Sequence, residues 1–239
     1  MSTATLTAAL THRLVLFAAA QLALTLAFAL AGVLDPFTAA GAWWPVTAIV
    51  VNVASLVLMR WWLHRHDRRL RDVYRVEPHS VPRVLGVVLI VTVVALALGA
   101  GGSLGLGALL FGDPQLAVAA LVHPLPAWAI IPVVVVFPLT TALVELPLYF
   151  GIVLPALRER GMGEWSAVIL TGGALALQHV AMPLALDPAF IAWRALMFVA
   201  FAVFLAFALS RRLVLLPYLV GAHYLLDLAV ALQFAAVAR

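Results

Sequence analysis

Four ionisable side chains lie inside long apolar stretches of this sequence. Glu145 lies within residues 130–157, and His179 lies in the stretch that follows. The last apolar stretch carries His223, with Asp227 four positions further on. An ionisable group at the centre of a membrane span is costly and marks a functional site by default. Because carboxylate and imidazole groups serve as general acids and bases, we expect these four residues to form one catalytic site.

The composition indicates that these stretches lie in a membrane. Hydrophobic residues make up 66% of the 239 positions, and the mean hydropathy is +1.14, whereas an ordinary soluble domain is about half apolar. The stretches are long enough for helices that cross hydrocarbon, which need about 20 residues, and they lack the alternation of barrel strands. The sequence therefore predicts an all-α, polytopic transmembrane helical bundle, with residues 1–239 forming a single integral membrane domain.

The positions of Pro, Gly and Arg residues separate the spans. We predict about seven spans, which are 14–34, 44–63, 84–111, 128–157, 165–186, 190–210 and 213–235. The first of them also has features of a secretory signal peptide. It is longer than the usual apolar core of such a peptide, which has about 7–15 residues, so we expect it to be retained as a span.

Arginine residues divide the connections between spans into two sets. They gather in residues 60–83 and in the short connections 158–161 and 210–212, whereas the three opposite connections contain none. Basic connections stay in the cytoplasm. We therefore predict a multi-pass protein of a bacterial cytoplasmic membrane with a cytoplasmic N-terminus. Residues 60–83 then form a basic cytoplasmic loop, which we expect to lie at the lipid headgroups.

The charged and sulfur-containing residues exclude several classes of function. All 14 basic residues are Arg, the formal net charge is +4, and the sequence has no Cys. Without Cys, disulfides, iron–sulfur clusters and thiol chemistry are excluded. Membrane topology already accounts for the distribution of Arg, so the basic charge does not indicate a nucleic-acid partner. We predict that the protein interacts with the lipid bilayer and not with nucleic acid. No cofactor is predicted either.

We expect the other ionisable residues near span ends to have structural roles. Arg194 lies a few positions from the turn at Asp187, so we expect it to reach the membrane interface or to pair with Asp187. The remaining histidines lie in the basic loop or near span ends and are given no chemical role: His12, His64, His66, His79 and His123.

Depth in the membrane tests whether the four candidate residues share a site. At about 1.5 Å per residue, Glu145 lies about 18 Å and His179 about 21 Å from the cytoplasmic end of its span. On the same basis, His223 and Asp227 lie at about 15 and 21 Å. A hydrocarbon core is about 30 Å thick, so all four fall near its middle. We expect one polar cavity there, reached from the cytoplasmic half or laterally from lipid.

The residues around Glu145 predict a change in its helix. Thr141 lies one turn before Glu145 and Tyr149 one turn after it, so a polar stripe extends along this face. Pro147 lacks a backbone donor and follows Glu145 by two positions. We therefore expect a kink or a wider groove at this point.

The order of these residues resembles the CPBP family of intramembrane endopeptidases, which includes the CAAX-prenyl proteases. The first motif of that family is usually EExxxR, and residues 145–151 match its first Glu and its trailing Gly. Leu146 stands in place of the second Glu, and Phe150 stands in place of the Arg.

Two later motifs complete the resemblance. The family's FxxxH is similar to residues 175–179, where Leu175 replaces the Phe and His179 is kept. The HxxxN/D pair is present as His223 and Asp227. The resemblance extends over residues 128–235, which we interpret as a family-like catalytic core.

The resemblance implies a glutamic-type, metal-independent endopeptidase. Glu145 and His179 would activate a water molecule for attack on a peptide carbonyl, and His223 and Asp227 would stabilise the oxyanion. The family often has Asn where this sequence has Asp227. An ionised Asp cannot donate a hydrogen bond, so Asp227 would orient His223, whose imidazole would donate. The implied substrate is a membrane-associated protein or peptide, with lipidated chains among the options.

Several alternatives remain open at the level of the sequence. A non-catalytic member of the same family would act as an immunity or scaffold protein, which the altered first motif favours. A zinc-dependent protease would use the same residues, since two His and two carboxylates suit Zn²⁺, although no HExxH motif is present. A proton-coupled carrier would need repeats or broken helices, and haem ligation by His179 and His223 has no second supporting feature.

Overall fold

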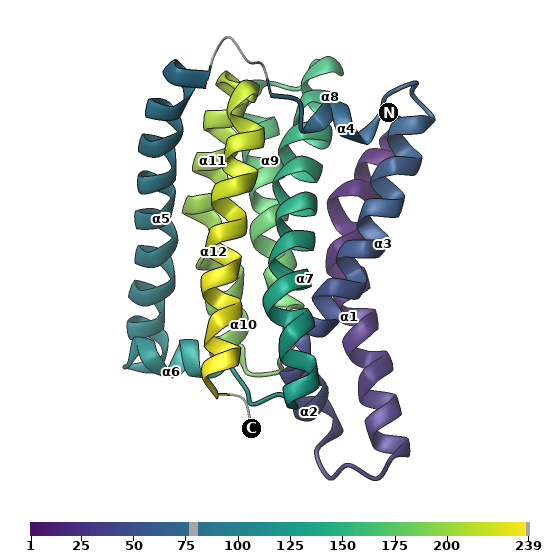
Figure 1. The fold of residues 1–239 in the computed structure, drawn as a ribbon, viewed down its shortest axis with the longest axis vertical. Helices are drawn as coiled ribbons and strands as arrows, with labels where there is room; N and C mark the ends of the chain where they lie inside the picture. The colour runs from purple at the N-terminus through teal and green to yellow at the C-terminus, as the bar shows by residue number, and fades with distance from the viewer. Residues whose placement is uncertain (77–80, 238–239) are drawn as a thin grey trace.

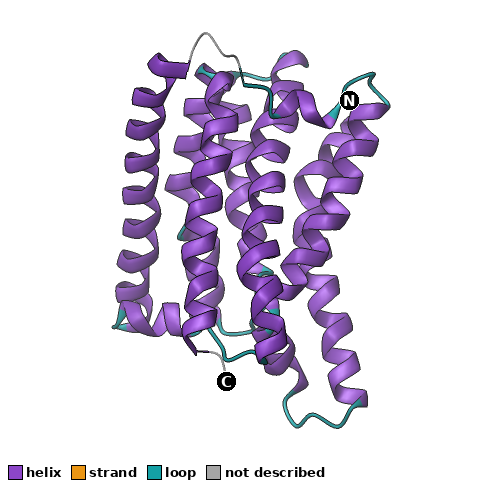
Figure 2. Cartoon of the chain, in the orientation of Figure 1, coloured by secondary structure: helices purple, strands orange, loops and turns teal. Residues whose placement is uncertain are grey.

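The computed structural model describes residues 1–76 and 81–237, and helices make up almost all of it (Figures 1 and 2). Residues 77–80 of the predicted basic loop, His79 among them, and residues 238–239 lie outside the described residues. The described ranges contain no β-strand and one isolated bridge between Ala181 and Leu184. The predicted all-α bundle is confirmed.

Long helices alternate with short ones along the chain. In order, the elements are α1 (Thr3–Leu30), α2 (Pro36–Ala42), α3 (Trp44–His64), α4 (Leu70–Val73), α5 (Val81–Phe111), α6 (Pro114–Ala119), α7 (Ala127–Leu146), η2 (Pro147–Val153), α8 (Leu154–Glu159), α9 (Glu164–Leu177), η3 (Gln178–Val180), α10 (Pro188–Leu196), α11 (Val199–Arg211), η4 (Leu213–Leu215) and α12 (Leu216–Val237). Of the elements labelled η, η2 is a π-helix, whereas η3 and η4 are 3₁₀-helices.

Six of the predicted spans correspond to helices, or runs of helices, that are long and apolar enough to cross a membrane. Within the described ranges these are Thr3–Leu30, Trp44–His64, Val84–Phe111, Ala127–Glu159, Pro188–Arg211 and Leu213–Val237. The predicted span 165–186 differs, because its α-helix α9 has only 14 residues. A helix of that length covers about 21 Å, less than a hydrocarbon core of about 30 Å. The remainder of this stretch is the turn η3 and an irregular segment.

Three Asp-Pro pairs begin short helices at one end of the bundle. Asp35, Asp113 and Asp187 are the N-caps of α2, α6 and α10, and each side chain accepts a hydrogen bond from a backbone N–H of the first turn. The following Pro occupies the first helical position, where its missing N–H is not needed. These Asp-Pro pairs therefore mark helix starts in the sequence.

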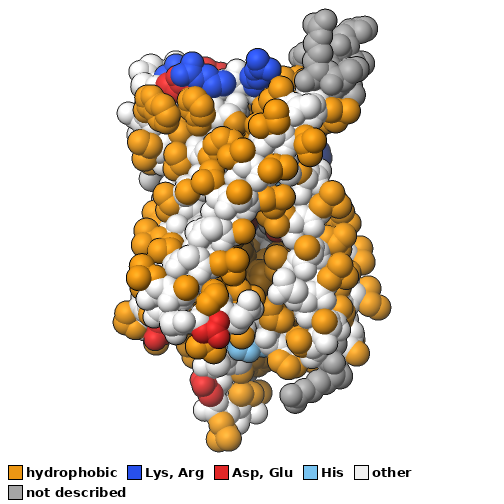
Figure 3. All heavy atoms as spheres, turned by 90° about the vertical axis from the view of Figure 1, so that its left-hand side faces the viewer, with side chains coloured by type: hydrophobic (Ala, Val, Ile, Leu, Met, Phe, Trp, Pro, Cys, Tyr) orange, Lys and Arg blue, Asp and Glu red, His pale blue; other side chains and the backbone are white. Residues whose placement is uncertain are grey.

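Helix α7 lies in the middle of the bundle. It packs against α12 on one side and α3 on the other, while α11 packs against α9 and α5. In Figure 1 the teal α7 stands between the yellow α12 and the blue α3. The N-terminus lies at the end that carries α4 and α8, and α12 ends at the opposite end of the bundle. Figure 3 shows Arg side chains gathered at the N-terminal end, as the alternation of the connections predicts.

Candidate functional site

Glu145 lies where helix α7 changes its type. α7 ends at Leu146, and Pro147 begins the π-helix η2. Pro147 has no N–H, so the α-helical hydrogen bond to the carbonyl of Leu143, four positions earlier, cannot form. At the position where a kink or a wider groove was predicted, the α-helix changes to a π-helix, a form that occurs frequently at functional sites.

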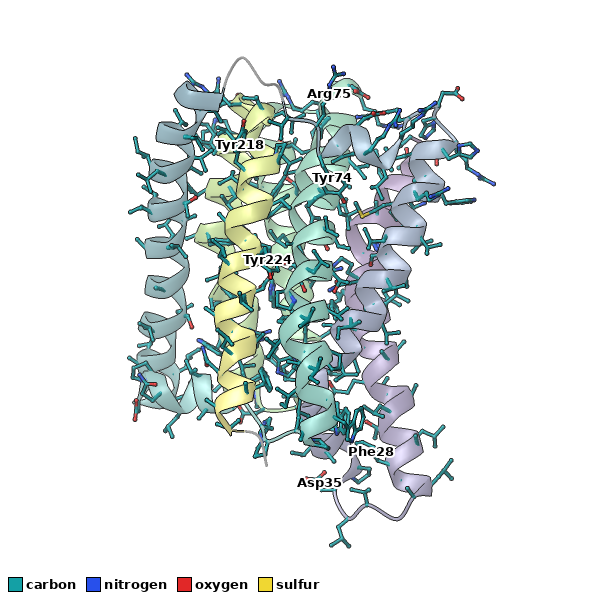
Figure 4. The ribbon with its side chains drawn as sticks, viewed as in Figure 1. Phe28, Asp35, Tyr74, Arg75, Tyr218 and Tyr224 are labelled. Atoms are coloured by element: carbon teal, nitrogen blue, oxygen red, sulfur yellow. The ribbon has the colours of Figure 1, made fainter. Side chains whose placement is uncertain are left out.

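Tyr74, directly after α4, contacts the carbonyl group of Leu143, to which Pro147 cannot donate a hydrogen bond. The hydroxyl of Tyr74 donates a hydrogen bond to the carbonyl oxygen of Leu143 at 2.5 Å (Figure 4 labels Tyr74). Burial raises the pKa of Tyr74 to about 12. Val73 is buried as well and packs against Gly151 of η2. Val73 and Tyr74 of the predicted headgroup loop therefore pack against the bundle, whereas Arg71 and Asp72 beside them are exposed.

The carboxylate of Glu145 is fully engaged by donors from three other elements. Its Oε1 accepts hydrogen bonds from Nη2 of Arg13 at 3.0 Å and from Nε2 of Gln178 at 2.8 Å. Its Oε2 lies 3.2 Å from Nε2 of His223. The side chain is 2% exposed. Because Arg13 forms an ion pair with it, the negative charge of Glu145 is compensated within the protein.

Arg13 of α1 connects Glu145 to a buried polar network. Its Nε donates to Oε1 of Gln178 at 2.6 Å, and its Nη1 donates to Oδ1 of Asn52 at 2.7 Å. Asn52 in turn donates to the hydroxyls of Thr140 and Thr141. Tyr149 completes this set, because its hydroxyl donates to Oε1 of Gln178 at 3.1 Å. The stripe predicted from Thr141 to Tyr149 is thus one wall of a larger network.

His179 lies on the turn η3, directly after α9. Its Nδ1 lies 3.0 Å from the carbonyl oxygen of Leu175 and 3.2 Å from that of Ala176. Carbonyl oxygens only accept, so Nδ1 carries the proton in these contacts. The ring packs against Phe198 with centroids 4.6 Å apart. In the neutral ring Nε2 is then the atom that can accept a proton.

His223 and Asp227 occupy one face of α12, as their spacing predicts. Nε2 of His223 faces both carboxylates, at 3.2 Å from Oε2 of Glu145 and 3.5 Å from Oδ2 of Asp227. This Oδ2 is buried and has no hydrogen-bond partner among the described residues. Glu145, rather than Asp227, therefore makes the closer contact with the imidazole.

All four predicted site residues line one cavity of about 240 Å³. Its remaining walls are largely apolar and include Trp44, Val122 and Val230. Trp44 begins α3 and Val230 lies near the end of α12, so the cavity extends toward the end of the bundle that carries α2 and α6 (Figure 1). The route by which the cavity is reached, from the cytoplasmic half or laterally from lipid, stays a prediction.

A second, smaller crevice approaches the site from the side. It has about 30 Å³ and is formed by residues of α5, α11 and α12, with His223 in its wall. Figure 3 faces α5 and shows the surface recessed at about mid-height. The lateral route predicted from the sequence would pass through this crevice.

Arg194 does not take the position expected for it. It is 3% exposed and lines the cavity, with its Nε donating to the carbonyl oxygen of His179 at 3.0 Å. A second bond goes from Nη2 to the carbonyl oxygen of Met182. Asp187 instead caps α10 by accepting from the N–H of Phe190. The prediction that Arg194 reaches the interface or pairs with Asp187 was therefore wrong.

The other histidines in the described residues lie away from the cavity walls. His12 contacts Ser55 and Trp62, and His123 contacts a backbone carbonyl. His64 and His66 are exposed. None of them contributes to the site.

The sequence interpretation missed two residues that organise the site. Neither Arg13 nor Asn52 was singled out from the sequence. Asn52 carried a usable signal, because a lone amide within an apolar span needs hydrogen-bond partners. Arg13 carried a weaker one, since basic residues at span ends are common.

Within residues 1–76 and 81–237, no group of three or more His, Asp or Glu side chains is arranged to hold a metal ion. No protein-family model, curated protein or solved structure matches the chain.

Proposed function

We propose that this chain is an intramembrane endopeptidase of the CPBP type, which hydrolyses a peptide bond in a membrane-associated protein or peptide. The observation that carries the proposal is that Glu145, His179, His223 and Asp227, from three parts of the chain, line one cavity. Their order and spacing resemble the motifs of that family. The cavity is largely apolar with a smaller number of polar groups in its walls, as substrate sites usually are.

The proposed reaction begins with a water molecule next to His179. Nε2 of His179 takes a proton from the water while the water oxygen attacks the peptide carbonyl carbon. The charge of Glu145 stabilises the imidazolium that forms. His223 donates a hydrogen bond to the oxyanion. When the C–N bond breaks, the proton on His179 passes to the leaving amine, so that two peptides with new termini result.

The surroundings of the reaction follow from the same proposal. The chain would lie in a bacterial cytoplasmic membrane with the N-terminus and the Arg-rich end in the cytoplasm. The substrate would be a peptide or protein, lipidated or not, that reaches the cavity through the bilayer. The crevice between α5, α11 and α12 supports a lateral route.

Substitution of His179 tests the proposal most directly. Purified protein in neutral detergent would be incubated with a mixture of synthetic peptides of all residue types, with and without a lipid anchor, and new termini would be identified by mass spectrometry. His179→Ala leaves the Arg13–Glu145 ion pair in place, so the protein should fold and lose cleavage by about a hundredfold or more. His66→Ala, at an exposed position, is the matched control. Equal cleavage by both variants would rule out this mechanism.

Glu145→Gln provides a second test, with exposed Glu159→Gln as its control. We expect cleavage to be lost only in Glu145→Gln. Its folding must be verified by thermal unfolding, because the substitution removes the partner of Arg13.

One observation favours a non-catalytic alternative. Both oxygens of Glu145 are already contacted by protein groups, namely Arg13, Gln178 and His223, as in a carboxylate that only joins helices. A scaffold or immunity protein of this kind would keep its effect in cells when His179 is replaced by Ala. Loss of that effect together with cleavage would exclude the alternative.

A further inference from the structure

Arg194 is a buried cation that the proposed reaction does not use. It lies on α10 and is 3% exposed, and its side chain lines the cavity. Its protein partners are the carbonyl oxygens of His179 and Met182 and, at 3.5 Å, the sulfur of Met197. Carbonyl oxygens and a thioether sulfur accept hydrogen bonds but carry no net charge.

The charge of Arg194 is not neutralised by any ion pair within the described residues. The other buried arginine, Arg13, has Glu145 at 3.0 Å. Asp187, which precedes α10, is used as its N-cap. A buried charge without a partner of opposite sign costs several kcal/mol, and inside a membrane such a residue marks a ligand or ion pathway. The structure therefore has a cation that faces the cavity without an ion pair within the described residues, although the carboxylates of Glu145 and Asp227 line the same cavity.

The guanidinium also retains donors for a ligand. An Arg side chain has five N–H groups in a planar fork, and the contacts of Arg194 engage Nε, Nη1 and Nη2 once each. Each Nη carries two hydrogens, so one N–H remains on each of these two nitrogens. Two donors on a planar fork match the two oxygens of a carboxylate.

The cavity walls define the rest of the ligand. Trp193, Met197 and Phe198 line the cavity next to Arg194, and they are apolar. The volume of about 240 Å³ is small compared with drug-sized sites of about 300–1,000 Å³. A ligand with a carboxylate on an apolar chain of medium length could pair with the Arg194 cation and pack against the apolar walls.

We infer that Arg194 is the anchor of a binding site for a carboxylate carried on an apolar chain. Two sources have this chemistry, a free fatty acid from the bilayer and the C-terminal carboxylate of an apolar peptide. Only the peptide source rests on the proposed endopeptidase function. The ligand would lie along Trp193 and Phe198 with its carboxylate at the guanidinium, beside the turn that carries His179.

Binding of paired acids and neutral analogues tests this inference without any need for hydrolysis. Isothermal titration of the wild-type protein in neutral detergent would compare decanoate with methyl decanoate, and an N-acetylated apolar tripeptide acid with its C-terminal amide. The charged member should bind about tenfold tighter, or more, in at least one pair. Preference in the decanoate pair alone identifies a fatty acid, and preference in the peptide pair alone identifies a peptide terminus. Equal binding within both pairs would overturn the inference.

Variants then locate the preference at Arg194. Arg194→Gln should bind acid and neutral analogue equally, whereas Arg194→Lys, which keeps the charge, should retain part of the difference. Arg212→Gln, which removes an exposed charge elsewhere, is the matched control and should bind as the wild type does. An undiminished preference in folded Arg194→Gln would overturn the assignment. Because the wild-type comparison needs no variant, the inference stays testable even if Arg194→Gln does not fold.

Discussion

Arg13 and Glu145 lie 132 positions apart in the sequence, yet Nη2 of one donates to Oε1 of the other at 3.0 Å. Both side chains are buried, at 0% and 2% exposure. Arg13 belongs to the first helix, whereas Glu145 lies in the last turn of α7 in the middle of the bundle. The first helix is therefore a structural part of the candidate site, and its removal as a signal peptide would leave Glu145 without its ion-pair partner.

Replacement of Arg13 should destabilise the fold more than replacement of the whole pair. Arg13→Met leaves a buried carboxylate without its cation, which costs about 3–5 kcal/mol. In Arg13→Met combined with Glu145→Gln no charge remains unpaired, so the double variant should recover part of that loss. Denaturant unfolding in mixed micelles, followed by circular dichroism, measures the four proteins of this double-mutant cycle. A cycle in which the two effects simply add would show that the pair is not coupled.

Gln21 should be needed to hold the segment that follows His179. Its Nε2 donates to the carbonyl oxygen of Leu184 at 2.7 Å, and its Oε1 accepts from the N–H of the same residue at 2.8 Å. Gln21→Met keeps the length of the side chain but leaves these two backbone groups unpaired, at about 1–3 kcal/mol each. Hydrogen exchange should become faster at residues 181–184. Gln115→Met, at an exposed position on α6, is the control, and equal stability of the two variants would contradict the prediction.

Much of the candidate site could be predicted from the sequence because membrane depth is a strong constraint. Counting residues from the span ends places Glu145, His179, His223 and Asp227 at a similar depth in the membrane. In the structure all four line one cavity. The all-α bundle follows from hydropathy alone. Both predictions depend on short-range patterns, namely the length of apolar stretches and the spacing of polar residues within them.

The parts that could not be predicted depend on contacts between distant helices. Arg13 and Arg194 both lie near a span end, where an Arg ordinarily reaches the headgroups. The structure instead buries Arg13 against Gln178 and Asn52, and Arg194 against backbone carbonyls. The non-helical half of the predicted span 165–186 is also a tertiary effect, because Gln21 and Arg194 satisfy the backbone groups of that segment.

Gly151 should not tolerate a side chain. A Cβ at this position would lie 2.6 Å from Cγ1 of Val73 and 2.8 Å from Cδ2 of Leu216. Gly151→Ala therefore overpacks the contact between η2, α4 and α12, with an expected loss of about 1–3 kcal/mol. Gly173 on α9 is the control, since nothing lies within 4 Å of a Cβ there, and Gly173→Ala should gain about 0.5–1 kcal/mol. Thermal unfolding in detergent would contradict the prediction if both variants moved in the same direction.

The hydroxyl of Tyr74 should stabilise the folded protein, and this stabilisation should be lost at alkaline pH. In the folded protein its pKa is about 12, and in an unfolded chain a Tyr has a pKa of about 10. The folded state therefore retains the proton more strongly than the unfolded state. The contribution is complete below pH of about 10 and is lost as the pH rises through about 12. At neutral pH, Tyr74→Phe removes the hydrogen bond to Leu143 and should cost about 1 kcal/mol.

A pH series of unfolding experiments separates this effect from general alkaline denaturation. The difference in unfolding free energy between the wild type and Tyr74→Phe should stay constant from neutral pH to about 10 and then shrink. Tyr224→Phe on α12, away from this contact (Figure 4), is the matched control. A constant difference up to pH of about 12 would mean that the Tyr74 hydroxyl does not titrate in a buried contact. The carbonyl oxygen of Leu143 would then need a hydrogen-bond donor other than Tyr74.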